Sequence, residues 1–138
     1  MTRLQRIGIA ALAVAGPALL LSAAPAPAQP SPQVVLKLGA RAPLTSQGKV
    51  ANVKVNITCN NASPAPITAT VDQNRGSVTA HGSGTSGTAY KCNGRTQHVV
   101  VPVKVGAGQH FHTGGASATA DVTIGGVPGH DARDIQLT

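Results

Sequence analysis

The chain is poor in carboxylate and aromatic side chains. Its 138 residues include no Trp, one Phe, one Tyr and no Glu, and its only carboxylate side chains are four Asp. Those aspartates are scattered along the chain, so the sequence offers no evident pair for general acid–base catalysis. No row of aromatic side chains exists on which sugars or single-stranded nucleic acid could stack. We therefore expect neither an enzyme nor a specific nucleic-acid binder.

The motifs of nucleophilic and redox catalysis are also missing. The chain contains no Gly-x-Ser-x-Gly sequence, and its two cysteines, Cys59 and Cys92, are too far apart for a Cys-x-x-Cys motif. His130 and Asp131 are neighbours in "GHDARD", but adjacency in sequence does not make a catalytic dyad. The sequence predicts no cofactor.

The N-terminus has the three-part form of a secretory signal peptide. Two Arg precede an apolar run from Ile7 to about Ala24, and Ala26-Pro27-Ala28 then gives an A-x-A cleavage pattern. An uncleaved membrane anchor is the alternative, but a Gly-Pro pair interrupts the run and no basic stop-transfer cluster follows it. We predict a signal peptide over residues 1–28, one secreted domain over residues 29–138, and no membrane span after cleavage.

Export makes a disulfide between Cys59 and Cys92 the expected state. The bond would close a loop of about 34 residues, which chain-entropy reasoning values at roughly 3–4 kcal/mol. Two free buried thiols are the alternative. The apolar content is mostly Ala and Val, so the core is thin and a covalent link would compensate for the small buried surface.

The balance of charge is basic. The formal net charge is +7, and removal of the two N-terminal Arg with the signal peptide leaves about +5. A basic exported protein tends to adhere to polyanions, so we expect anionic polymers of the cell envelope as partners. The sequence does not predict an oligomeric state.

Several segments after Pro30 alternate apolar and polar residues with period two, and none has a helical period. The alternation is clearest in residues 53–59, 67–71 and 98–105, each of which predicts a half-buried strand. Further strands are predicted at residues 33–38, 77–82, 87–92, 110–122 and 133–137. Seven or eight short strands without a helix predict an antiparallel, immunoglobulin-like β-sandwich with one disulfide.

Pro102 is unusual for its place in one of these segments. A proline has no N–H to donate to a β-ladder, so the edge of the strand toward which its nitrogen points must face solvent or a bulge. This restricts the order of the strands and leaves the fold class unchanged.

The order of these features resembles small secreted β-sandwich proteins of actinobacteria that have no assigned function. The resemblance is carried by "VKVNITCNN", "GSGTSGTAYKCNG", "HVVVPVKV" and "GQHFHTGGASATADV". It implies an immunoglobulin-like fold and export from an actinobacterial cell, and it brings no catalytic residue. A fainter similarity, in size and in Ala, Gly, Thr and Val content, is to enediyne-binding apoproteins of the neocarzinostatin type. Those proteins have two disulfides, and this chain also differs from them in being basic.

The sequence "QHFHTGG" contains the candidate metal site. On a strand, His110 and His112 would project from the same face, where two imidazoles can share a Cu(II) or Zn(II) ion. A third ligand would be needed. The sequence offers His130, Asp131, His81 and His98.

The alternative for this segment starts from Phe111, the only Phe in the chain. If its ring packs into the core, both neighbouring histidines face solvent and need have no function. We favour this interpretation. The metal site then requires the turn "GGVPGHD" to bring His130 or Asp131 over the outward face of His110 and His112.

Three functional hypotheses follow from the sequence. The first is a secreted, non-enzymatic β-sandwich that acts as a structural or binding module of the cell envelope. The second is a copper- or zinc-binding sandwich that uses the His-x-His pair. The third is a small-molecule carrier of the neocarzinostatin type, which would need an apolar cleft between loops.

Overall fold

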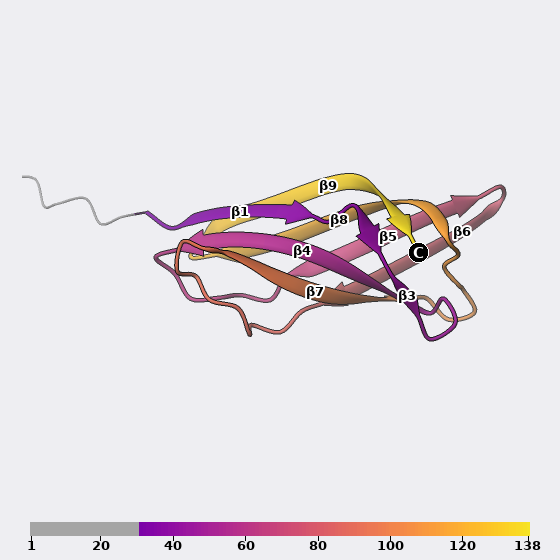
Figure 1. Cartoon of the computed structure of the whole chain (residues 1–138), viewed down its shortest axis with the longest axis horizontal. Coiled ribbons are helices and arrows are strands. Elements are labelled where there is room, and N and C mark those ends of the chain that lie inside the picture. The colour runs from indigo at the N-terminus through magenta and orange to yellow at the C-terminus, as the bar shows by residue number, and fades with distance from the viewer. Residues whose placement is uncertain (1–30) are drawn as a thin grey trace, which may run out of the picture.

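The computed structural model describes residues 31–138, whose regular structure is entirely β-strand (Figure 1). The predicted signal peptide, residues 1–28, lies outside the described residues. In the described part of the chain, no helix has the length and apolarity needed to cross a membrane. The strands are β1 (Gln33–Leu38), β2 (Arg41–Ala42), β3 (Leu44–Thr45), β4 (Val50–Asn60), β5 (Thr68–Arg75), β6 (Val78–Thr85), β7 (Thr96–Val105), β8 (Gly114–Ile124) and β9 (Val127–Leu137).

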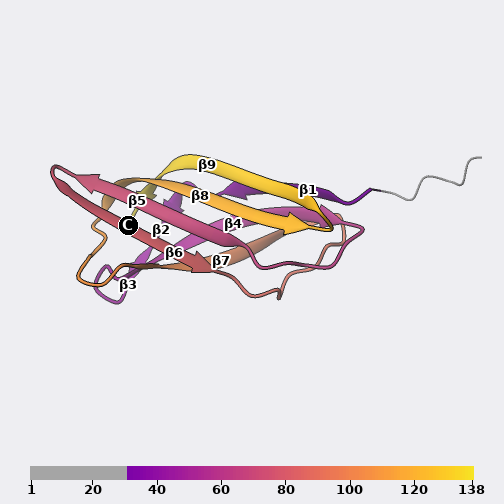
Figure 2. The same cartoon turned by 180° about the vertical axis from the view of Figure 1, so that it is seen from behind.

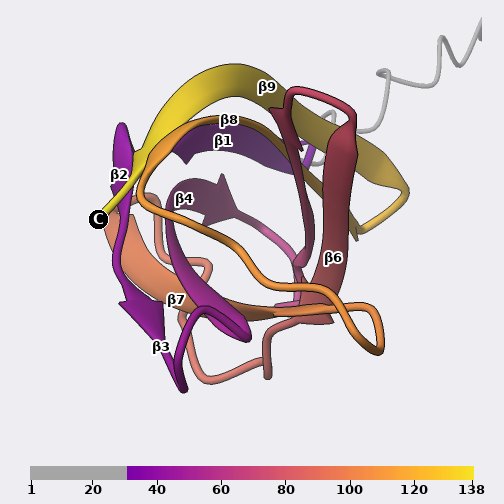
Figure 3. The same ribbon diagram turned by 90° about the vertical axis from the view of Figure 1, so that its right-hand side faces the viewer.

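All nine strands belong to one curled sheet, in the order β1-β4-β7-β6-β5-β8-β9-β2, with β3 paired to β4. Every pairing is antiparallel except that of β2 with β9. Because β2 follows β1 after only two residues, the two ends of the sheet meet in one segment of the chain (Figure 3). The all-β prediction is confirmed, with nine strands in place of seven or eight and one curled sheet in place of two separate sheets.

The apolar alternation in the sequence correctly predicts the core. On β4, on β7 and in the segment that leads through β5, the predicted inward-facing side chains are buried or half-buried, and the outward-facing ones alternate with them. The fully buried members are Val53, Val55, Ile57, Cys59, Ile67, Ala69, Val71, Val101 and Val103.

The sheet divides at the junction between β6 and β7. Only Gly82 with Val105 and Ser83 with Lys104 are paired there. Pro102 lies just beyond this short ladder and has no N–H with which to extend it. The narrow junction separates a first half, β1-β4-β7, from a second half, β6-β5-β8-β9, and the two halves face each other across the core (Figure 2).

Side chains close the seam where β1 runs beside β9. The backbone N–H of Leu38 donates to Asp131 Oδ2 at 2.7 Å, and the Arg133 guanidinium donates to the Leu38 carbonyl at 3.1 Å. Past this point the chain crosses to β9, where the Gln136 N–H donates to the Ala40 carbonyl at 2.9 Å. Asp131, a candidate metal ligand in the sequence, therefore holds the two ends of the sheet together.

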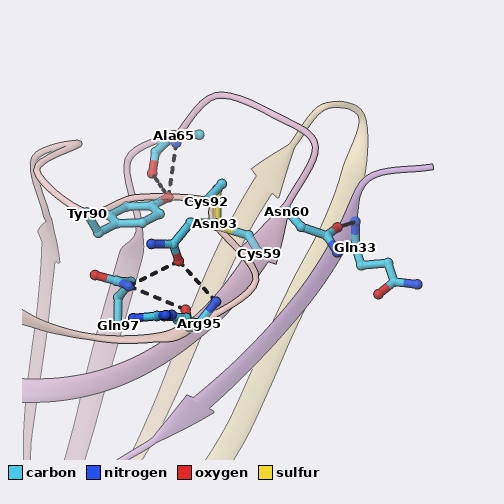
Figure 4. Close-up of a disulfide and its surroundings, with 9 residues drawn as sticks. All are labelled: Gln33, Cys59, Asn60, Ala65, Tyr90, Cys92, Asn93, Arg95 and Gln97. Carbon is cyan, nitrogen blue, oxygen red and sulfur yellow. Dashed lines mark hydrogen bonds between the residues drawn. A yellow bond between two sulfur atoms is a disulfide. The ribbon is translucent and has the colours of Figure 1, made fainter. Parts of the chain in front are cut away.

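The predicted disulfide between Cys59 and Cys92 is confirmed, and it joins the end of β4 to the loop 86–95 (Figure 4). The Tyr90 hydroxyl accepts the Ala65 N–H at 3.0 Å and donates to the Ala65 carbonyl. The Gly94 N–H donates to the Cys59 carbonyl at 2.8 Å. The prediction of a strand over residues 87–92 is therefore wrong. Tyr90 and Cys92 do pack at the edge of the core, but the backbone of this segment forms a loop.

The predicted turn over residues 125–130 is much shorter in the structure. Gly125 and Gly126 have φ of 56° and 81°, which L residues with side chains rarely adopt, and they make a two-residue turn between β8 and β9. From Val127 onward the chain is already β9. The segment that would have folded over the histidine pair is therefore part of the sheet.

Candidate functional site

The hairpin of β5 and β6 extends beyond the rest of the sheet (Figure 1). β5 pairs with β8 only over residues 68–72, and β6 pairs with β7 only at Gly82 and Ser83. Residues 73–75 and 78–80 pair with each other, and no third strand of the described chain pairs with either of them. This hairpin tip continues the inner face of the sheet past the end of the core.

The loop 106–113 covers part of the inner face of the hairpin tip. The His81 N–H donates to Gln109 Oε1 at 2.9 Å, and the Gly106 N–H donates to the His81 carbonyl at 3.1 Å. Phe111 is buried, with 2% of its surface exposed, while His110 and His112 are exposed. The favoured interpretation of the Phe is confirmed, but the predicted strand over residues 110–122 begins only at Gly114.

The buried Gln73 side chain makes the hydrogen bonds to the loop 106–113 that a neighbouring strand would otherwise make. Gln73 is 2% exposed, and its Oε1 accepts the His112 N–H at 2.8 Å. Its Nε2 donates to the His112 carbonyl at 2.7 Å and to the Gly115 carbonyl at 3.3 Å. Sequence reasoning missed Gln73, although the inward alternation of Ala69 and Val71 extends to it without a break.

A hollow of about 560 Å³ lies between the hairpin tip and the loop, and we call it the end hollow. Arg75 and Val78 are cross-strand partners on its hairpin side, and Val78 is 66% exposed because the core stops short of it. Of the described residues, no carboxylate lines the hollow. Its lining consists of Gln73, Arg75, Gly76, Val78, Ala80, His110 and His112.

The residues proposed as metal ligands are not brought together. The described part of the chain contains no group of three or more His, Cys, Asp and Glu side chains placed to hold a metal ion. His110 and His112 share the end hollow, but His130 lies on β9 with its Nδ1 2.5 Å from Asp121 Oδ1. The β8–β9 turn packs near Pro32, toward the other end of the sheet from the loop 106–113.

The three remaining histidines form cross-strand pairs on the outer surface. His81 is hydrogen-bonded to Asp72, His130 to Asp121, and His98 Nδ1 lies 2.6 Å from Asn56 Oδ1. In each pair the two residues are directly opposite in the strand register. Because these side chains are largely exposed, such pairs contribute little to stability. They are ordinary surface contacts of a sheet.

The fold separates the charges that are mixed in the sequence. All four Asp lie on β5, β8 and β9, together with Arg75 and Arg133. The first half of the sheet and the loops that lead into β4 and β7 carry cations and no carboxylate. These cations are Lys37, Lys49, Lys54, Lys91, Arg95 and Lys104. Within residues 31–138, no Lys or Arg forms a salt bridge with a carboxylate.

Three of these lysines share one surface, which we call the basic face: the outer side of β1, β4 and β7. Lys37, Lys54 and Lys104 are all exposed there. The register places Lys37 in a row with Asn56 and His98, while Lys54 lies opposite Val100 on β7. In the sequence these lysines are scattered over different elements, and only the strand register shows that they share one face.

No protein-family model matches this chain, and no curated protein matches it significantly. The candidate sites are therefore interpreted from their own geometry. The basic face and the end hollow both present basic side chains, and no carboxylate lies among the described residues that form them.

Proposed function

We propose that this chain is an exported, non-enzymatic module that binds a linear anionic polymer of the cell envelope through the basic face. The observation that carries the proposal is the separation of charge: the outer side of β1, β4 and β7 presents lysines with no carboxylate among them. The aspartates that would neutralise the lysines lie on the second half of the sheet.

The spacing on the basic face suits a repeating anion. Same-face positions along a strand are about 6.6–7 Å apart, and neighbouring strands are about 4.8 Å apart. Lysine carries a point charge on a flexible stem, so it accepts phosphate or carboxylate groups without a fixed approach geometry. Asn56 and Thr58 follow Lys54 on the outer side of β4, with Asn56 directly opposite Lys37, and their polar side chains can hydrogen-bond to hydroxyl groups of a polymer backbone.

The proposal includes export and an evolutionary relationship. The cleavage of residues 1–28 would place the domain outside the cell, and the Cys59–Cys92 disulfide supports this because such bonds persist in oxidising compartments. We also propose that the curled sheet is a variant of the immunoglobulin-like sandwich found in the secreted actinobacterial proteins that the sequence resembles. The narrow β6–β7 junction between two facing halves supports that relationship.

Binding to long-chain polyphosphate and to polygalacturonate, with neutral dextran as the control, tests the proposed function. The polyanions should bind at an ionic strength of about 0.02 M and dissociate at about 0.5 M, because salt screens exposed charges. The double variant Lys37→Gln/Lys54→Gln should lose about thirtyfold in affinity, on the basis of about 1 kcal/mol per lysine at an anionic surface.

The matched control is the double variant Arg41→Gln/Lys91→Gln, which removes the same charge from β2 and from the loop 86–95, away from both the basic face and the end hollow. It should bind the polyanions almost as well as the unaltered chain. Equal losses in the two double variants would show that affinity follows net charge alone and would overturn the basic face as the binding site. Dextran binding as strong as that of polyphosphate would overturn the electrostatic proposal as a whole.

A further inference from the structure

The inner face of the β5–β6 hairpin tip is an apolar surface that the core does not cover. Val78 points to the same side as the buried Ala80, two residues further along β6, yet it is 66% exposed. A core-facing valine left in water loses the free energy that burial would give it, about 1.5–3 kcal/mol for a full side chain. A ligand that covered Val78 would recover part of that free energy.

One guanidinium and two imidazole side chains border this apolar surface. Arg75 lies directly opposite Val78, and His110 and His112 line the hollow from the loop 106–113. The His110 Nδ1 lies 3.3 Å from the Gln47 carbonyl, and this contact helps to position the ring at the edge of the hollow. Guanidinium groups bind carboxylate-like anions through two parallel hydrogen bonds. The hollow therefore combines an apolar wall with an anion-binding rim.

The frame of the hollow is fixed without a ligand. Gln73 holds His112 through both ends of its carboxamide, and the Phe111 N–H donates to the Gly48 carbonyl at 2.8 Å. Gly48 has φ of 80°, and a Cβ there would lie 2.3 Å from the Phe111 carbonyl oxygen, so only glycine allows this close approach. Preformed walls lower the entropic cost of binding.

We propose that the end hollow binds a small amphiphilic anion, with a carboxylate or sulfonate head at Arg75 and an apolar body over Val78 and Ala80. The hollow, at about 560 Å³, has the size of small-molecule sites in proteins. This site is separate from the basic face, which lies on the outer side of other strands, so the two proposals fail or succeed independently.

Calorimetry with decanesulfonate tests the proposal, because this ligand has both parts and stays ionised at all working pH values. Decanol lacks the charge and methanesulfonate lacks the apolar body, so both should bind at least about tenfold more weakly. The variant Arg75→Gln should lose about tenfold to a hundredfold in affinity, the range expected for a hydrogen bond to a charged group. Val78→Ser should also weaken binding.

The control variant is Arg95→Gln, which removes one arginine from the loop 86–95 at a distance from the hollow. It should bind decanesulfonate like the unaltered chain. Arg75, Val78 and Arg95 are all exposed, so none of these substitutions threatens folding, and circular dichroism will verify it. Equal affinity of the Arg75→Gln variant and the unaltered chain, or equal affinity for decanol and decanesulfonate, would overturn the proposal.

Discussion

Gln73 on β5 holds the backbone of His112 on both sides, with its carboxamide oxygen accepting the N–H and its carboxamide nitrogen donating to the carbonyl. These are the two hydrogen bonds that a residue of a neighbouring strand would make. The relationship explains how a loop without ladder partners of its own keeps Phe111 in the core and two histidines on the rim of the end hollow.

The substitution Gln73→Ala should therefore destabilise the fold. It leaves the His112 N–H and carbonyl without their partner in a part-buried place, which costs roughly 1–3 kcal/mol in the free energy of unfolding. Denaturant unfolding followed by circular dichroism measures the loss. Gln97→Ala is the control, because the Gln97 side chain makes only hydrogen bonds of 3.4 Å near the surface. Similar losses in the two variants would contradict the role given to Gln73.

The sequence predicts the parts of this fold that depend on local alternation. The inward positions of β4 and β7 follow from period two alone, since a half-buried strand must place every second side chain in the core. The disulfide follows from the cysteine count combined with the predicted signal peptide. The strand predictions that were wrong concern two segments held by side chains, the loop 86–95 by Tyr90 and the loop 106–113 by Gln73. A hydrogen bond between residues far apart in the sequence leaves no local pattern from which it could be predicted.

The candidate site shows the same limit. The burial of Phe111 between the exposed His110 and His112 could be predicted from the sequence, because a large apolar side chain is usually buried in the core. The end hollow could not be predicted from the sequence, since it depends on how far the β5–β6 hairpin extends past the neighbouring strands β7 and β8. The basic face could not be predicted either, because Lys37 and Lys54 come close together only through the register of β1 with β4.

The seam between β1 and β9 should depend on one carboxylate. Asp131→Ala removes the acceptor of the Leu38 N–H and should lower the free energy of unfolding by about 1–3 kcal/mol, as for a buried donor left unpaired. Asp134→Ala is the matched control on the same strand, because Asp134 accepts only a 3.3 Å bond from Ser117 on the exposed surface. Thermal unfolding of the two variants compares them directly. An equal effect would show that general charge, rather than the seam, decides stability.

Alkaline unfolding should report on Tyr90. Burial raises the pKa of the Tyr90 phenol above its ordinary value, and the hydrogen bond with the Ala65 backbone lowers it by a smaller amount. The unfolded chain therefore loses this proton first, so the contribution of Tyr90 to stability is complete below about pH 10 and is lost as pH rises further. Tyr90 is the only tyrosine, so phenolate absorbance titrates it alone. Its midpoint should lie above that of N-acetyltyrosinamide, and a midpoint at or below that reference would contradict the buried position. In Tyr90→Phe, stability should decline less steeply above pH 10.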